Sequence, residues 1–293
     1  MTSLSVVVCT HNRPAELSAC LAALADEDAG AQVIVVDSAS PVPCEALVES
    51  YRDRLPELVY RYVAEPGLSL ARNAGLAASD GDIVAFIDDD AAPLAGWGTA
   101  LLAAFAEDPE IGCVGGACLA RFAGARPRWL SDRLLQFASI TRWGEEAREP
   151  RSSAEWPFGA NMVFRRAALD EVGPFALELG RNGARSLLSG EDSDMVARVL
   201  AAGWRVWLEP RARVLHTVHA ERLTAGFYWR RFWWAGVGRA QVATWRTTLR
   251  LLAAAPVRLV MWLLTRDRVY MYRLAETAGY VASLASGAPA ERS

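Results

Sequence analysis

Short β-branched runs alternate with Ala- and Leu-rich helical stretches through the first third of the chain. These runs are almost continuously apolar, which is typical of strands that are buried on both faces of a parallel sheet. The predicted strands are 4–9, 33–36, 58–63 and 82–87, and one of the intervening helices covers about 69–79. The alternation predicts an α/β fold with a Rossmann-like, mostly parallel central sheet flanked by helices.

The pattern is less regular after Pro93, where a helix begins, and it has an irregular stretch from about 121 to 157. Further strands are predicted at 111–118, 161–164, 204–208 and 212–215, with a helix that ends near 202. From Glu221 onward the chain has a helical pattern, which Pro256 and Asp267 are expected to break into pieces.

Polar residues follow the predicted strands at the edge where parallel sheets bind ligands. These residues are Thr10, Asp37 and the run Asp88-Asp89-Asp90. Three consecutive carboxylates repel one another, and a divalent cation would relieve that repulsion. Hard oxygen ligands favour magnesium or manganese. An acidic surface loop is the alternative interpretation, and the sequence leaves open where Asp89 points.

Other polar residues permit both a structural and a functional interpretation. Ser189-Gly190-Glu191-Asp192 fits a helix capping box, but Asp192 at a helix start would also suit a general base for an acceptor hydroxyl. His216 and His219 follow an apolar strand as polar caps or as ligands. The pairs Asn12-Arg13 and Arg72-Asn73 are either ordinary turn and helix residues or part of a site.

The arrangement resembles glycosyltransferase family 2, whose members have the GT-A fold and transfer sugars with inversion. The resemblance covers about residues 4–240 and depends on the order and spacing of several motifs. They are VVVCTHNRP (6–14), VIVVDSAS (33–40), GLSLARNAGLAAS (67–79), FIDDD (86–90), FGANMVFRR (158–166), SGEDSDM (189–195), and the His216 segment with Arg230-Arg231 and Gly236.

The resemblance implies a role for each matching residue. Asp192 would be the catalytic base, next to Glu191, and Asp90, Asp88 and His216 would bind Mn2+ or Mg2+. The residues expected at the nucleotide are Thr10, Asn12, Arg13, Asp37, Arg72, Asp88 and Asp89. A UDP-sugar is the expected donor, and a glycan, a lipid-linked molecule or a small molecule would supply the acceptor hydroxyl. Residues 1–220 would form the catalytic domain, with a nucleotide-sugar half (about 1–118) and an acceptor half (about 119–220).

Charge and composition narrow the possible partners and exclude several chemistries. The net charge of −3 argues against a general nucleic-acid binder, and all 31 basic residues are Arg, which excludes lysine-dependent chemistry. Residues 1–220 carry −10 and residues 221–293 carry +7. The five cysteines contain no C-x-x-C pair, so we expect reduced thiols and a cytoplasmic location.

The basic tail, 221–293, is predicted to be an amphipathic helical extension. Its charge-free stretches around Arg258, 251–257 and 259–265, are too short for a spanning helix. Arg interspersed with Trp and Leu suits an element that lies on the anionic inner face of a membrane. Packing on the catalytic domain and a homodimer contact are the alternatives.

Two other functions compete with sugar transfer. A sugar-nucleotide nucleotidyltransferase would usually carry a Gly-rich loop and a Lys at the first strand end, where this chain has Thr10-His11-Asn12-Arg13. A catalytically inactive relative that binds carbohydrate or acts as a scaffold is the second alternative. A dehydrogenase is disfavoured because no G-x-G-x-x-G follows the first strand.

Overall fold

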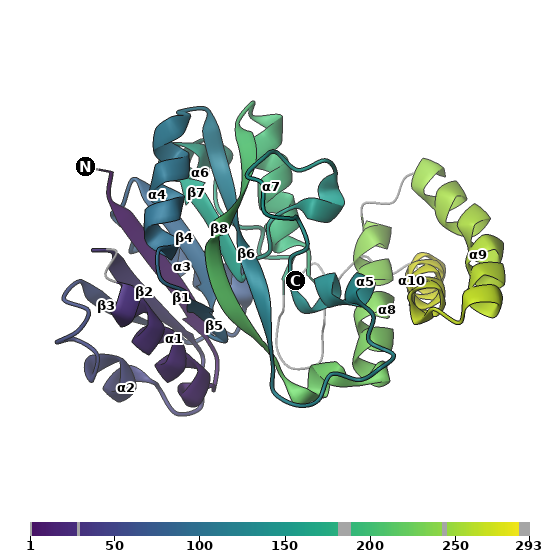
Figure 1. The fold of residues 1–293 in the computed structure, drawn as a ribbon, viewed down its shortest axis with the longest axis horizontal. Helices are drawn as coiled ribbons and strands as arrows, with labels where there is room; N and C mark the ends of the chain where they lie inside the picture. Colours follow the sequence, from purple (N-terminus) through teal and green to yellow (C-terminus); the bar gives the residue numbers. More distant parts are fainter. Residues whose placement is uncertain (1, 28–29, 181–188, 242–244, 287–293) are drawn as a thin grey trace. The chain divides into compact units, whose positions relative to one another are not determined.

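The computed structural model describes residues 2–27, 30–180, 189–241 and 245–286. The chain divides into two compact units. The first comprises 1–121, 139–177 and 191–217, and we call it the catalytic unit because it contains the predicted site residues. The second, the helical unit, comprises 122–138, 178–190 and 218–293. Figure 1 shows the elements of both units.

An eight-stranded sheet has the order β3-β2-β1-β4-β7-β6-β8-β5. The strands are β1 (Leu4–Thr10), β2 (Gln32–Ser38), β3 (Leu58–Val63), β4 (Ile83–Asp88), β5 (Ala91–Pro93), β6 (Ile111–Phe122), β7 (Asn161–Arg165) and β8 (Arg205–Val218). The predicted α/β sheet is confirmed, although it is mixed. β3, β2, β1 and β4 are parallel, whereas the β4–β7, β6–β7 and β5–β8 pairs are antiparallel.

Helices cover both faces of the sheet. Those of the catalytic unit are α1 (Pro14–Glu27), α2 (Glu45–Glu49), α3 (Leu68–Ala77), α4 (Trp97–Glu107), α6 (Arg166–Val172) and α7 (Glu191–Ala201). Val6 and Val8 of β1 belong to a core with α1 and α4, and Val7 belongs to a second core with α3, α6 and α7. Successive strand residues point to opposite faces, so one β-branched run serves two hydrophobic layers.

The helical unit contains α5 (Asp132–Leu135), α8 (Ala225–Gln241), α9 (Trp245–Thr265) and α10 (Arg268–Ala285). Short 3-10 turns lie at Gln136–Ala138 and Ala220–Leu223, and a third lies at Ser153–Glu155 in the catalytic unit. Asp267 caps α10 by accepting a hydrogen bond of 2.9 Å from the Val269 amide, so the predicted break there is confirmed.

Three details of the second half of the chain differ from the sequence prediction. The strands predicted at 204–208 and 212–215 form one strand, β8, which continues through Pro210. α9 continues through Pro256, because strong helix formers such as Ala253–Ala255 and Leu259 surround that proline. The irregular stretch contains α5 and two short 3-10 turns.

α9 is the helix, among the described residues, that is long and apolar enough to cross a membrane. Its 21 residues include a window with a mean hydropathy of 1.4, of which only 6% is buried in the structure. Counting charge-free stretches did not predict this, because Leu, Val, Ala and Met outweigh the interspersed Arg in the mean. Length and composition alone are weak indications of a span.

Candidate functional site

Parallel pairing brings the polar strand ends of the catalytic unit to one edge of the sheet. Thr10 is the register partner of Asp37, and Cys9 is the partner of Asp88. This places the ends of β1, β2 and β4 side by side, as the sequence predicts. All of the site residues discussed below belong to this unit.

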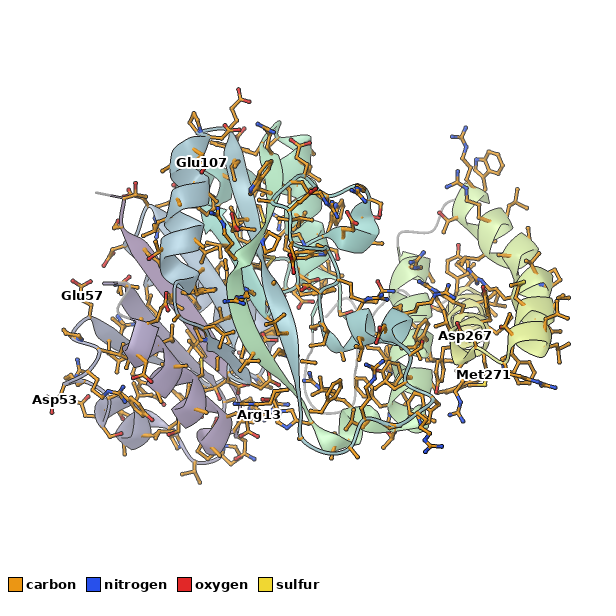
Figure 2. The ribbon with its side chains drawn as sticks, viewed as in Figure 1. Arg13, Asp53, Glu57, Glu107, Asp267 and Met271 are labelled. Atoms are coloured by element: carbon orange, nitrogen blue, oxygen red, sulfur yellow. The ribbon has the colours of Figure 1, made fainter. Side chains whose placement is uncertain are left out.

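The acidic run turns inward after β4. Asp88 is partly exposed, and Asp89 and Asp90 are buried. The Thr10 hydroxyl donates to Asp89 Oδ2 over 2.8 Å. Arg13 Nη1 donates to Asp89 Oδ1 over 3.2 Å and to Asp90 Oδ2 over 3.1 Å. Arg13, labelled in Figure 2, therefore holds two carboxylates together just before α1 begins.

The pKa of Asp89 reflects its burial close to other acids. Burial and the neighbouring Asp90 raise its pKa to about 7, even though Arg13 and Thr10 act in the opposite direction. The side chain points toward Thr10 and Arg13 rather than into solvent, which answers the question that the sequence left open. The carboxylates at this edge of the sheet thus carry more negative charge than Arg13 neutralises.

His216 of β8 completes a possible ligand set. It pairs in register with Ala91 of β5, and the Thr217 amide donates to the Asp90 carbonyl over 2.8 Å. His216 Nε2 lies 3.1 Å from Asp90 Oδ1. The His216 ring is fully buried, and neither ring nitrogen makes a hydrogen bond within the described part of the chain. A close approach without a hydrogen bond is what two ligands of one ion would make.

Asp88, Asp90 and His216 each offer one ligand atom, and these atoms lie within 4.8 Å of one another. Two carboxylate oxygens and one imidazole nitrogen fit a divalent ion such as Mn2+, which accepts both kinds of ligand. The predicted three residues are therefore together in space, and the orphaned histidine nitrogens agree with the fit.

Arg72 of α3 connects this cluster to α7. Its guanidinium is buried and lies 3.0 Å from Glu191 Oε1 through Nη1 and 3.8 Å from Asp88 Oδ1 through Nη2. It also lies over the Phe175 ring, 5.5 Å from the centroid. The Arg72 side chain therefore positions Glu191 and Asp88, and its guanidinium group is surrounded mostly by protein atoms.

Gly159 makes room for this arrangement. A Cβ atom at that position would lie 2.0 Å from Arg72 Nη2, which no real contact allows. Sequence reasoning included Gly159 only as part of the FGANMVFRR motif and missed its role as a spacer. Phe175, which stacks on Arg72, was missed altogether, because an apolar residue in a loop carries no chemical signal of its own.

Asp192 differs from its neighbour Glu191. It is half-buried and accepts hydrogen bonds from neutral groups: the Ser193 amide at 2.7 Å, the Gly159 amide at 3.4 Å and the Ser193 hydroxyl at 3.5 Å. Burial and the adjacent Glu191 raise its pKa, although Arg72 lowers it. A carboxylate of raised pKa is suited to accept a proton.

Asp37 organises the loop after β2. Its oxygens accept from the Ser40 amide at 3.0 Å, the Cys44 amide at 2.9 Å and the Tyr60 hydroxyl at 3.1 Å. Burial opposes ionisation, but the hydrogen bonds from Ser40 and Cys44 outweigh it, and the pKa of Asp37 is lowered. An ionised, fixed carboxylate therefore lies at the end of β2.

Asn12 lies beside that loop. Its amide donates to the Ser40 hydroxyl over 2.8 Å, and its side chain is exposed. Its φ of 53° is in the left-handed region, which Asn tolerates better than most residues. This hydrogen bond connects the loop after β1 to the loop after β2.

Comparison with known proteins agrees with this geometry. The family model described as glycosyl transferase family 2 matches residues 5–173. The chain belongs to glycosyl transferase family 2. It is a family 2 glycosyltransferase that is 31% identical, over 225 residues, to the succinoglycan biosynthesis protein ExoM of Rhizobium meliloti. That alignment covers 75% of this chain and 68% of the relative.

Two further relatives are named as transferases. The pre-mycofactocin glycosyltransferase of Mycobacterium tuberculosis is 34% identical over 64% of this chain, but only 37% of that protein is covered. The glucosyl-dolichyl phosphate glucuronosyltransferase of Haloferax volcanii is 24% identical over 80% of this chain and 76% of its own length.

Solved structures show that this glycosyltransferase has the GT-A fold. GalNAc-T7 with UDP, GalNAc and Mn2+ has a TM-score of 0.58 at 18% identity, over 76% of this chain and 44% of the other. TarS 1-349 of S. aureus with UDP-GlcNAc has a TM-score of 0.57 at 18% identity, over 97% and 91%. The mannosyltransferase PcManGT of Pyrobaculum calidifontis with GDP-Man and Mn2+ has a TM-score of 0.55 at 21% identity, over 99% and 77%.

Proposed function

We propose that this glycosyltransferase moves a sugar from a UDP-sugar to an acceptor hydroxyl, with inversion at the anomeric carbon and with bound Mn2+ or Mg2+. The observation that carries the proposal is the clustering of Asp88, Asp90 and His216. These residues would hold the ion, which would neutralise the diphosphate as it leaves. Two of the structural neighbours, GalNAc-T7 and PcManGT, were solved with Mn2+ and a nucleotide or nucleotide sugar.

Asp192 takes the proton in this proposal. The acceptor oxygen attacks the anomeric carbon from the face opposite the diphosphate, the bond to the phosphate oxygen breaks, and the hydroxyl proton passes to Asp192. A single displacement inverts the configuration, and it requires a base but no second carboxylate as nucleophile. The neutral hydrogen-bond donors around Asp192 leave its charge available for the proton.

Glu191 and Arg72 act as positioning residues in this proposal. Glu191 is ion-paired with Arg72, and the pair fixes the start of α7 relative to Asp88. Thr10 and Arg13 hold Asp89 and Asp90 in place beside the nucleotide. Asn12 and Asp37 border the nucleoside from the loops after β1 and β2.

The proposed acceptor is a hydroxyl of a glycan or of a lipid-linked molecule in polysaccharide or glycoconjugate synthesis. The names of the relatives support this class, since they include a succinoglycan biosynthesis protein and an enzyme that acts on glucosyl-dolichyl phosphate. The proposed location is the cytoplasm, peripheral to the inner face of the membrane. The five cysteines are free thiols, which is consistent with a reducing compartment.

A thermal-shift screen tests the donor and the metal together. UDP, GDP, dTDP and CDP would each be added with Mn2+, with Mg2+ or with EDTA, and UDP with Mn2+ should raise Tm most, because a ligand of the native state stabilises it. Donor hydrolysis measured in parallel separates an active enzyme from an inactive relative. Asp90→Asn should lose the part of the shift that depends on Mn2+, and Asp53→Asn, which changes an exposed acid of the same unit (Figure 2), is its matched control. Failure of all four nucleotides to shift Tm would refute the proposal.

A further inference from the structure

α9 of the helical unit exposes many large apolar side chains. Its large exposed side chains are Trp245, Leu249, Leu252, Val257, Leu259, Val260, Leu263 and Leu264. The exposure reaches 69% at Trp245 and 75% at Leu264. A contiguous apolar surface of this kind marks an interaction site.

The exposed residues form a stripe along the helix. Trp245, Leu249, Leu252, Leu259 and Leu263 follow one another at intervals of four, three, seven and four residues, which places them on one face. The stripe therefore has the length of the helix and the pattern of an amphipathic surface.

The other face of α9 is already used inside the helical unit. Leu251 is buried, and Arg258 Nη1 donates to the Thr277 hydroxyl over 2.7 Å and to the Arg273 carbonyl over 3.2 Å. Figure 1 shows α10 lying between α8 and α9. α9 is thus held on α10 by one side, and its apolar stripe has no covering element among the described residues of the unit.

The positive charge around the stripe indicates which kind of partner it binds. From Arg222 to Arg266 the sequence contains eight Arg and no Asp or Glu. Arg246 lies over the Trp245 ring, with 5.4 Å to its centroid, and Arg266 lies over Trp262 at 5.6 Å. An apolar face with Arg and Trp at both ends suits the boundary between acyl chains and anionic headgroups.

We propose that α9 binds an anionic lipid bilayer by lying in its plane, with the stripe in the acyl region and Arg246, Arg250 and Arg266 at the headgroups. Spanning would place Arg250 and Arg258 in hydrocarbon and would break the bonds from Arg258 to α10. A second copy docked on the same stripe would bring like charges together, since a two-fold interface repeats one surface. The proposal does not depend on the donor or the metal.

Vesicle co-sedimentation of the full chain tests the proposal. The protein should sediment with vesicles of phosphatidylcholine containing about 30% phosphatidylglycerol and stay in solution with phosphatidylcholine alone, and high salt should weaken the binding. Arg246→Gln with Arg250→Gln should lower the partition coefficient about fivefold for each Arg removed.

Leu249→Glu with Leu263→Glu should abolish sedimentation, with Tm and donor hydrolysis unchanged because both positions are exposed. Val42→Glu with Leu177→Glu is the matched control, since it changes exposed apolar residues of the catalytic unit and adds the same charge. Equal binding to both vesicle types would overturn the proposal. The proposal would also be overturned by a dimer in solution that Leu249→Glu with Leu263→Glu dissociates. Resistance of the protein to carbonate extraction from cell membranes would overturn it as well, because it would indicate a spanning helix. If donor hydrolysis fails while the vesicles bind, only the proposed reaction is refuted.

Discussion

The helical unit and the catalytic unit each bury carboxylates beside arginines, but with a different balance of charge. In the helical unit, Glu276 of α10 is 1% exposed. Its Oε1 lies 2.8 Å from Arg239 Nε, and its Oε2 lies 2.8 Å from Arg273 Nη1. Two guanidinium groups thus surround one carboxylate, and the cluster joins α8 to α10.

The catalytic unit has the reverse balance. Four carboxylates, those of Asp88, Asp89, Asp90 and Glu191, share two guanidinium groups. The formal charge of this set is −2, which is the charge that one divalent cation cancels. Burial is the largest cause of the raised pKa of Asp89, and repulsion from the neighbouring Asp90 adds to it.

The difference separates two uses of buried charge. In the helical unit every carboxylate charge of the cluster is paired, so removing Glu276 leaves its arginines uncompensated and lowers stability. In the cluster of the catalytic unit, the excess negative charge would favour a bound cation, and with it the diphosphate of the proposed donor. In this chain, a metal site is therefore expected at the cluster where the carboxylates outnumber their basic partners.

The largest expected effect is that of Asp192→Asn on turnover. We expect kcat to fall by about a thousandfold, since general bases contribute on the order of 10² to 10⁴. Donor affinity and Tm should stay near the wild-type values, because Asp192 bonds to neutral groups. Steady-state kinetics with a saturating donor measures this.

Glu191→Gln is the matched comparison for Asp192→Asn. Glu191 is ion-paired with buried Arg72, so this variant should lower Tm as well as activity. Equal kinetic and thermal effects of the two variants would contradict the assignment of Asp192 as the base.

Glu276→Gln should lower the free energy of unfolding by about 3 kcal/mol, because Arg239 and Arg273 would lose the buried charge that pairs them. Urea unfolding measures this, and Mn2+ binding should be unchanged. Asp53→Asn, at an exposed position, should change stability by less than about 0.5 kcal/mol. A Glu276→Gln variant as stable as the wild type would show that these ion pairs contribute nothing to stability.

Asp90→Asn should remove the stabilisation that Mn2+ gives the wild-type protein. At an Mn2+ concentration one hundred times Kd, that stabilisation is about 2.7 kcal/mol. Asp90 offers a ligand atom beside His216 Nε2, and an amide is a weaker ligand for the ion. Thermal shift with and without Mn2+ measures the difference, and Glu276→Gln should keep the full shift. An undiminished shift in Asp90→Asn would place the ion elsewhere.

The strands of the first half of the sheet, and the edge at which several candidate site residues lie, could be predicted from the sequence because they depend on local patterns. Continuous β-branched runs located β1 to β4, and their parallel order put Thr10, Asp37 and Asp88 at one edge. The antiparallel half of the sheet was not predicted, because strand direction depends on crossovers between distant segments such as β4 and β7.

The contacts that organise the site are long-range, and for that reason the sequence did not reveal them. Arg72 and Glu191 are 119 residues apart, and nothing near either one indicates the pair. The stacking of Phe175 and the spacing role of Gly159 depend on the same tertiary arrangement. At Pro256 a local rule was misleading, because the surrounding helix formers outweighed one missing amide.

The smallest expected effect is a shift in the acid limb of the pH–activity profile. Burial and Glu191 raise the pKa of Asp192 above the ordinary value of 3.8. A base works only when it is unprotonated, so kcat should fall as the pH drops through this raised pKa and should recover fully above it. The profile would be measured with saturating donor and Mn2+, and with Tm recorded at each pH so that acid unfolding is not mistaken for protonation. Glu191→Gln removes the neighbouring negative charge and should move the limb to lower pH, whereas Asp53→Asn should leave it in place. A limb that does not respond to Glu191→Gln would mean that a group other than Asp192 accepts the proton.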